Sequence, residues 1–465
     1  MLVVVLLVVV VIVAVLAGVH WYVWRRLVRD TTARGGAARR AGTVSAWVLP
    51  LLSVGALVSG RAGAPFWLQR VVAWPGYLWL AVLLYLTLAL VVGEGVRVLL
   101  RRALERRATA AMAGGKSLTQ PLPETAEQAP RTPGPTPAAA GATAQVEPGR
   151  AAVVTTPTAD AGTNGTLAAP VPEVVPAPEA VSADPPAGRS APSRRMFVSR
   201  VVGGGAAAVA LGTVGYGTYG VLRGPRVKRV TVPLVRLPRA AHGFRIAVVS
   251  DIHLGPILGR AHTRRIVDTI NATSPDLVAV VGDLVDGTVA DLGPAAEPLA
   301  QLRSRHGSFF VTGNHEYFSG AEEWVDHVRE LGLRPLRNER VEIGGFDLAG
   351  VNDLAGESEG DGPDFAKALG DRDPARASVL LAHQPVVIHD AVEHGVDLQL
   401  SGHTHGGQLW PGNHLAALAN PTVAGLERYG DTQLYVTRGA GAWGPPVRVG
   451  AASDITVVQL ASRQA

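Results

Sequence analysis

Residues 244–253 have the sequence FRIAVVSDIH, and residues 276–286 have the sequence DLVAVVGDLVD. Each stretch contains a short run of apolar, mostly β-branched residues, and an aspartate follows the run after one small residue, Ser250 or Gly282. Because neither run alternates with polar residues, both predict strands that are buried on both faces. Comparable runs occur at 307–312, 346–351, 377–382, 397–401, 433–437 and 454–460.

Helical patterns alternate with these runs near residues 260–273, 290–304, 320–332 and 385–394. Alternation of strands and helices favours an α/β architecture. Residues 226–465 are long enough to bury a sizeable core. We therefore assign this range to one α/β domain.

Polar side chains follow five of the predicted strands. They are Asp251 and His253, Asp283 and Asp286, Asn314 and His315, His383, and His403 and His405. Ligand sites in open α/β sheets gather at the carboxyl ends of strands, so we expect these side chains to lie together. Carboxylate, amide and imidazole groups suit Mn, Fe or Zn, and the chain has no cysteine to supply a thiolate.

The order of these residues resembles that of the calcineurin-like metallophosphoesterase superfamily. The matching motifs are Asp251-x-His253, Gly282-Asp283-x-x-Asp286, Gly313-Asn314-His315-Glu316, His383 and Gly402-His403-x-His405. The later stretch 438–448, RGAGAWGPPVR, resembles the bacterial membrane-associated branch, some of whose members have twin-arginine-type signals. The resemblance spans residues 228–462 and implies the αββα fold, a two-sheet β-sandwich flanked by helices.

The resemblance also implies two divalent metal ions and the residues that bind them. One ion would be bound by Asp251, His253 and His405, the second by Asn314, His383 and His403, and both by Asp283. A shared carboxylate would offset the repulsion between two nearby cations. Metal-activated hydroxide would then attack phosphorus. His315 would protonate the leaving oxygen and Asp286 would orient His315.

The first 107 residues are predicted to form a membrane region with three transmembrane helices. The apolar stretches 2–24, 44–60 and 71–93 are the predicted spans, and the first and third match the thickness of a bilayer best. Arginines crowd residues 25–40 and follow the third span. The positive-inside rule therefore predicts that these loops are cytoplasmic and that the N-terminus is outside.

Residues 108–192 are rich in Pro and Ala, and we predict a disordered linker there. The following sequence, Ser193-Arg194-Arg195-x-Phe197 and a glycine-rich apolar run from 201 to 222, resembles a twin-arginine export signal. An ordinary fourth span is the alternative. We assign 193–225 to this signal and to a fourth transmembrane anchor, which would place the next domain outside the cytoplasm.

The charge of the chain divides unevenly between its halves. Residues 1–225 have 21 Lys and Arg against 10 Asp and Glu, whereas residues 226–465 have 22 against 28. An acidic domain lacks the basic surface that nucleic acid requires, so no nucleic-acid partner is expected.

We therefore predict a metal-dependent phosphoric ester hydrolase in the cell membrane. It would be multi-pass, with an extracytoplasmic catalytic domain and the twin-arginine machinery as an export partner. It would cleave phosphate ester or pyrophosphate bonds of a phosphorylated small molecule or lipid, with manganese among the candidate metals. The alternative is a polytopic sensor or scaffold whose phosphoesterase-like domain binds metal without catalysis.

Overall fold

The computed structural model describes residues 2–115 and 194–464 of the chain. Residues 2–104 and 194–464 form one compact unit, which contains the apolar helices and the α/β domain. Of the second unit, only residues 105–115 are described. Most of the predicted linker, residues 116–192, lies outside the described residues.

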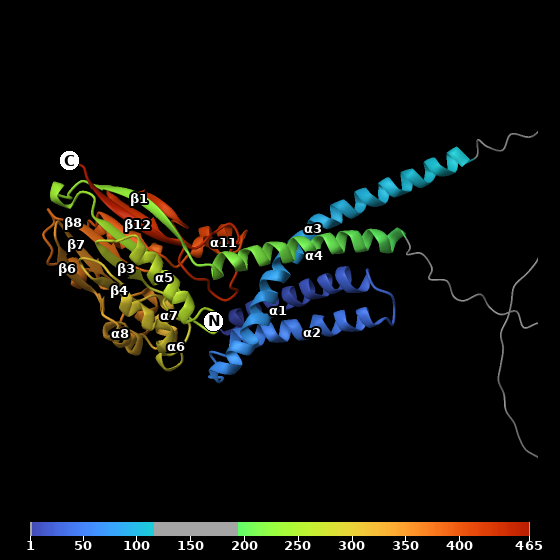
Figure 1. Cartoon of the computed structure of the whole chain (residues 1–465), viewed down its shortest axis with the longest axis horizontal. Helices are drawn as coiled ribbons and strands as arrows, with labels where there is room; N and C mark the ends of the chain where they lie inside the picture. Colours follow the sequence, from blue (N-terminus) through green and yellow to red (C-terminus); the bar gives the residue numbers. More distant parts are fainter. Residues whose placement is uncertain (1, 116–193, 465) are drawn as a thin grey trace, which may run out of the picture. The chain divides into compact units, whose positions relative to one another are not determined.

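The α/β domain contains two six-stranded mixed sheets (Figure 1). The first has, in spatial order, β1 (Arg226–Leu234), β12 (Asp454–Ser462), β2 (Arg245–Val249), β3 (Leu277–Val281), β4 (Ser308–Val311) and β5 (Leu333–Pro335). The second has β10 (Gly425–Tyr429), β11 (Thr432–Val436), β9 (Leu398–Ser401), β8 (Ala377–Leu381), β7 (Phe346–Gly350) and β6 (Glu339–Ile343). Strands β2, β3, β4 and β5 are parallel, as are β7, β8, β9 and β11.

The two sheets pack face to face through a buried apolar core. Ile246 and Val248 of β2 belong to the same core cluster as Leu348 of β7 and Val379 of β8. The domain also contains seven α-helices among its described residues: α5 (Arg260–Ala272), α6 (Val289–Ala296), α7 (Asn314–Ser319), α8 (Ala321–Glu330), α9 (Phe365–Leu369), α10 (Ile388–Glu393) and α11 (Gly412–Ala419).

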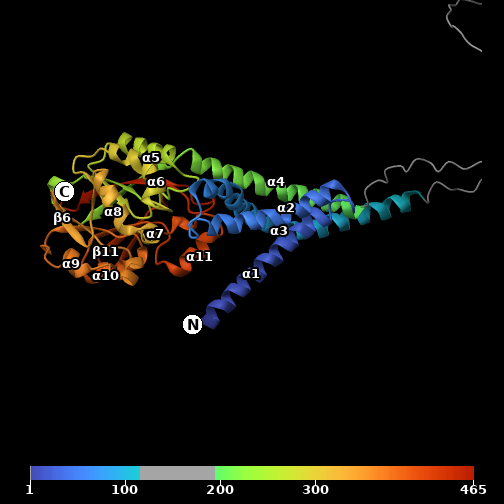
Figure 2. The same cartoon turned by 90° about the horizontal axis from the view of Figure 1, so that it is seen from below.

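Helices cover the outer face of each sheet. A second core cluster joins the first sheet to α5, α6 and α8, where Trp324 is fully buried. A third cluster joins the second sheet to α9 and α10. Figure 2 shows α5 and α6 on one side of the sheets and α9 and α10 on the other. This four-layer arrangement confirms the predicted two-sheet sandwich flanked by helices.

The first apolar helix has the bounds of the predicted first span, and the other three are longer than their predicted spans. The apolar helices are α1 (Leu2–Trp24), which continues as a π-helical turn (Arg25–Arg29), α2 (Ala37–Val58), α3 (Phe66–Gly115) and α4 (Arg194–Leu222). Among the described residues, four helices are long and apolar enough to cross a membrane by length and composition. Helix α3 also includes residues 108–115, which the predicted linker had contained, because the alanines and Met112 in this stretch favour helix.

Charged contacts tie the apolar helices together at one end of the bundle. Arg26 Nη2 donates to Glu94 Oε2 of α3 at 2.9 Å, and the Tyr22 hydroxyl donates to Glu94 Oε1 at 3.0 Å. Arg200 Nε of α4 donates to the Thr31 carbonyl at 3.0 Å. The residues that follow α1 therefore lie beside the start of α4, with their arginines at the same end.

The opposite end of the bundle contacts the α/β domain. Tyr85 of α3 donates its hydroxyl proton to the Trp410 carbonyl at 3.0 Å. Val447 of the domain is buried with Ala206, Ala210 and Val214 of α4. Helix α4 then leads directly into β1. The bundle and the domain therefore share an interface made by residues distant in sequence.

Candidate metal centre

The predicted site residues meet where the carboxyl ends of the two sheets come together. They follow β2, β3 and β4 in the first sheet and β8 and β9 in the second. Since parallel strands present their carboxyl ends at the same edge, residues up to 154 positions apart converge there. Among the described residues, three overlapping groups could hold a metal ion. Two of them share Asp283, and the other consists of His253, Asp286 and His315.

The first group joins Asp251, His253, Asp283 and His405, whose candidate ligand atoms all lie within 4.8 Å of one another. His253 Nε2 is 3.0 Å from His405 Nε2. His405 Nε2 is also 3.3 Å from Asp251 Oδ1. All four residues are buried. Two ring nitrogens that face each other with carboxylates beside them are arranged as ligands of a common cation.

The second group joins Asp283, His383 and His403. His383 Nε2 lies 3.1 Å from Asp283 Oδ2 and 3.3 Å from His403 Nδ1. The other ring nitrogen of His383 donates to the Val281 carbonyl at 2.8 Å, which leaves Nε2 free to bind a metal. Asn314 supplies a further acceptor at the carboxyl end of β4, because its buried Oδ1 has no hydrogen-bond partner among the described residues.

Asp283 belongs to both groups, so a single buried carboxylate lies between the two candidate metal positions. The backbone N–H of His315 donates to Asp283 Oδ1 at 3.0 Å and holds this carboxylate in place. The His and Asp residues that the resemblance assigned to each metal ion lie together in these two groups, with Asp283 in both. The individual ligand roles remain predictions.

Asp286 joins the metal centre to the predicted catalytic histidine. Its Oδ1 lies 2.6 Å from His315 Nδ1 and 3.1 Å from His253 Nδ1. Asp286 therefore contacts both His315 and the ring of the candidate ligand His253. Its role in orienting a catalytic His315 remains a prediction. The motif did not reveal the contact with His253, because His253 is 33 positions away in sequence.

Five candidate ligands have left-handed backbone conformations, which non-glycine residues rarely adopt. Their φ angles are 53° for Asp251, 48° for His253, 53° for Asp283, 70° for His403 and 52° for His405. Each such conformation costs on the order of 1 kcal/mol or more, and this kind of strain concentrates at functional sites. The turns after the strands thus aim side chains into the site at the expense of local stability.

Glycines make room for the carboxylates. A Cβ atom at Gly402 would collide with Ser250 Oγ and Asp251 Oδ2, and one at Gly313 would collide with Asp283. Glu316 is buried nearby and accepts hydrogen bonds from the backbone N–H groups of Gly313, Asp283 and Leu284. Glu316 therefore fixes the two turns that present Asp283 and Asn314.

The buried carboxylates of the centre favour positive charge on the groups around them. Burial lowers the pKa of His253, but the nearby carboxylates of Asp286 and Asp283 outweigh this effect and raise the pKa to about 9. Burial likewise opposes protonation of His383, but Asp283 raises the pKa of His383 well above its usual range. In contrast, burial and the neighbouring His383 lower the pKa of His403 to about 4. Protons on His253 and His383 therefore balance the buried carboxylates, and metal ions would replace that charge.

Burial raises the pKa of Glu316 to about 7, and Asp283 adds to this effect. For Asp286, burial would raise the pKa, but His253 and His315 lower it to about 2. Asp286 is therefore ionised and remains a hydrogen-bond acceptor for both histidines. The residues present fit divalent metal ions, since buried carboxylates, imidazoles and an orphaned amide oxygen converge on two adjoining positions.

Arg448 reaches the centre from the C-terminal part of the domain. This buried side chain donates through Nη1 to the His405 carbonyl at 3.0 Å, and its Nη2 lies 3.1 Å from His405 Nδ1. Burial lowers the pKa of Arg448 to about 10. Arg448 therefore positions a candidate ligand, and no motif linked it to His405.

The model of the calcineurin-like phosphoesterase family matches residues 244–407, the range that contains every candidate ligand. The chain is 38% identical to an uncharacterized metallophosphoesterase of Helicobacter pylori over 272 residues, which are 58% of this chain and 73% of that protein. It is also 35% identical to an uncharacterized metallophosphoesterase of Aquifex aeolicus over 240 residues. These residues are 50% of this chain and 91% of that protein.

The chain belongs to the calcineurin-like metallophosphoesterase family.

This metallophosphoesterase is also similar to a transmembrane protein with metallophosphoesterase domain from Danio rerio. The two are 40% identical over 259 residues, which are 53% of this chain and 59% of the Danio rerio protein. The match thus spans less than two thirds of that relative. Because bacterial and vertebrate proteins both match, assignment to the bacterial branch remains a prediction.

We expect Gly402→Ala to weaken metal binding, because the added Cβ would displace Asp251 from the first group of ligands. Changes next to metal ligands typically cost about 10–100-fold in metal affinity. The affinity of the full chain for Mn²⁺ in detergent would be measured by titration after chelation.

Gly344→Ala is the matched control for the metal affinity of Gly402→Ala. Gly344 lies in the turn between β6 and β7, and an added Cβ would meet no atom within 4 Å. Its metal affinity should equal that of the wild type. Wild-type affinity in Gly402→Ala would show that Asp251 is not a ligand.

Proposed function

We propose that the chain is a membrane-anchored, dimetal-dependent phosphoesterase that cleaves phosphate ester or pyrophosphate bonds of a lipid-linked substrate. One observation supports this substrate class above others. A cavity of about 250 Å³ is lined both by His253, Asp286 and His315 and by residues of α2, α3 and the turn between them. The candidate metal centre therefore opens toward the apolar helices rather than toward a remote face of the domain.

The helix side of this cavity contributes apolar and cationic side chains. Phe66 and Tyr77 of α3 line it, and Arg61 in the turn between α2 and α3 is the one arginine of its described lining. An apolar tail and a phosphate on one substrate would find matching partners here, since pockets bind apolar groups through apolar walls and orient ligands by a few polar groups.

Two exposed aromatic residues stand beside His315. Phe318 is 68% exposed and Trp443 is 51% exposed, and their rings lie 5.5 Å and 5.8 Å from the His315 ring. Large exposed aromatic side chains next to reactive groups are typical of a substrate surface. We assign these two rings to the part of the substrate that leaves with the cleaved oxygen.

The residues of the site would have separate roles in the hydrolysis. Two bound divalent ions would supply charge neutralisation at the phosphate and lower the pKa of the attacking water. Asp283 would hold both ions. His315 uses Nδ1 for Asp286, so Nε2 is the ring atom that can give a proton to the leaving oxygen. The Asp286 carboxylate contacts Nδ1 and holds the ring in that orientation.

The function is tested on the full chain in detergent, stripped with a chelator and refilled with Mn, Fe or Zn. The substrates are a nitrophenyl monoester, a nitrophenyl diester, a lipid monophosphate and a lipid pyrophosphate. We expect turnover that disappears with the metal and returns with it, and that is fastest on a lipid member. Metal binding without turnover on any substrate would favour the sensor or scaffold alternative.

We expect His315→Ala to keep its metal while kcat falls by roughly 10²–10⁴-fold, the usual loss for a general acid. The metal should stay because the contact with Asp283 comes from the backbone N–H of His315, which alanine retains. The loss should be smaller for nitrophenyl esters, whose leaving oxygen needs little protonation. Equal losses for good and poor leaving groups would exclude the general-acid role.

We propose further that the catalytic domain lies outside the cytoplasm. The arginines that follow α1 lie beside the start of α4, as the contact between Arg200 and Thr31 requires, and the catalytic domain adjoins the other end of the bundle. The positive-inside rule then assigns the arginine-rich end to the cytoplasm. Arg194 and Arg195 at the start of α4 would engage the twin-arginine export machinery.

The topology is tested by protease access to residues 226–465 in intact spheroplasts. We expect cleavage in the wild type and protection when Arg194→Lys and Arg195→Lys are combined, because lysine does not replace the arginine pair of such signals. Protection of the wild-type domain would contradict the topology. Equal access in both forms would contradict only the twin-arginine route.

A further inference from the structure

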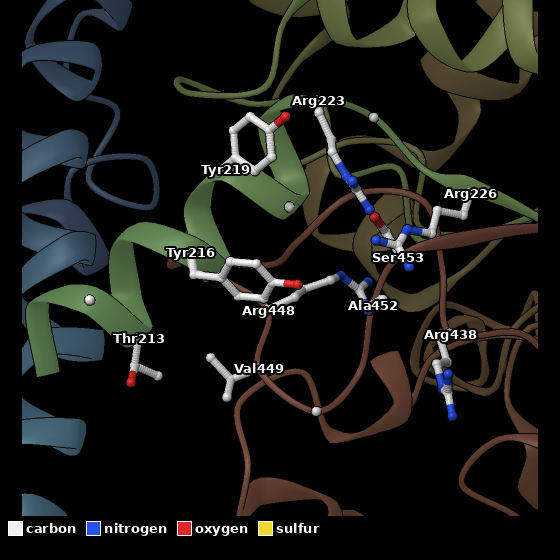
Figure 3. Close-up of a pocket in the computed structure, with 14 residues that line it drawn as sticks. Thr213, Tyr216, Tyr219, Arg223, Arg226, Arg438, Arg448, Val449, Ala452 and Ser453 are labelled. Carbon is white, nitrogen blue, oxygen red and sulfur yellow. The ribbon is translucent and has the colours of Figure 1, made fainter. Parts of the chain in front are cut away.

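We propose that a second cavity, at the junction of α4 and the C-terminal loop of the domain, binds the phosphate headgroup of an anionic membrane lipid. The cavity has a volume of about 540 Å³ and is shown in Figure 3. Its walls come from the last turns of α4, the first residue of β1 and the segment that precedes β12. It goes beyond the proposed function, because it lies apart from the catalytic cavity and takes a lipid that is not hydrolysed.

The lining of this cavity has a strong positive charge. It includes Arg223, Arg226, Arg438 and Arg448 and, among its described residues, no aspartate or glutamate. Within residues 2–115 and 194–464, none of these four arginines forms an ion pair with a carboxylate. Four guanidinium groups around one cavity repel each other, so an anion that enters it would be strongly stabilised.

The four arginines differ in how free they are to bind an anion. Arg448 is buried and donates to the carbonyls of Gly441, His405 and Ala451, so it contributes charge but few free donors. Figure 3 shows the side chain of Arg223, the residue after the end of α4, reaching toward Arg226 and Ser453. Arg223 and Arg226 are both exposed and keep their donors free. Paired guanidinium groups of this kind bind phosphate oxygens in bidentate geometry.

The position of the cavity on α4 favours a lipid over a soluble phosphate. Helix α4 is one of the four helices apolar enough to span a membrane, and the arginines begin directly after its last residue, Leu222. Gly212, Thr213 and Tyr216 continue the same wall along the apolar helix. Acyl chains could therefore lie along α4 while the headgroup meets the arginines.

Two exposed tyrosines on this wall indicate where the lipid headgroup would lie. Tyr216 and Tyr219 are 74% and 62% exposed, and both line the cavity. Figure 3 shows the Tyr216 hydroxyl pointing toward Arg448. Tyrosines concentrate at membrane interfaces, where the ring is in the apolar region and the hydroxyl faces the headgroups.

The second cavity and the catalytic cavity have no described lining residue in common. None of the candidate metal ligands lines the second cavity, and neither Arg223 nor Arg226 lines the catalytic cavity. A defect in one cavity can therefore be measured without disabling the other.

The test is native mass spectrometry of the full, delipidated chain in detergent, with dioleoyl phosphatidylglycerol as the anionic lipid and dioleoyl phosphatidylcholine as the neutral one. We expect one phosphatidylglycerol per chain to be retained over phosphatidylcholine. Arginines near an anionic lipid surface contribute about fivefold each, so Arg223→Gln combined with Arg226→Gln should weaken retention about 25-fold. Metal content equal to the wild type would show that this variant is folded.

The matched control is Arg229→Gln. Arg229 is an exposed arginine on β1 that has no described ion-pair partner and does not line the cavity, so its variant should retain phosphatidylglycerol like the wild type. Equal retention in the wild type and the double variant would overturn the site. Competition with inorganic phosphate distinguishes the source of the anion. Full displacement by inorganic phosphate, with no preference between the two lipids, would overturn the assignment to a lipid.

Discussion

The structure depends on one electrostatic constraint, the burial of carboxylates at the joint end of two sheets. Asp251 and Asp283 are almost completely buried, and Asp286 lies beside them. Removing such charges from water is costly unless opposite charge is close by. Five histidines surround them, and the negative charge of the carboxylates keeps two of those rings, His253 and His383, protonated although burial opposes it. The left-handed turns, the glycines and the Glu316 hydrogen bonds all serve to hold this arrangement.

The sequence allowed prediction of the interior of the fold but not of its edges. All eight predicted strands are present and occupy interior positions of the two sheets. The four unpredicted strands, β1, β5, β6 and β10, are the edges of the sheets. Interior strands are apolar on both faces and are therefore visible as continuous apolar runs. Edge strands such as GLERY at 425–429 are polar and exposed, so hydrophobic periodicity cannot reveal them.

The candidate site was predictable for a related reason. Its ligands follow interior strands, so local motifs identify the residues and parallel topology brings them together. Contacts between distant segments were not predictable. Asp286 holds the ring of His253, and Arg448 contacts His405 across 43 positions. The arginine cavity on α4 likewise combines segments more than 200 positions apart, which no local pattern relates.

The central claim is that Asp283 joins two metal ions into one hydrolytic centre. Elemental analysis of the purified full chain and of Asp283→Asn, combined with turnover of a nitrophenyl ester, tests this claim most directly. Our account predicts two divalent ions per wild-type chain and the loss of both metal and turnover in Asp283→Asn, because the amide removes the charge that the ions share. Two bound ions and full turnover in Asp283→Asn would contradict it.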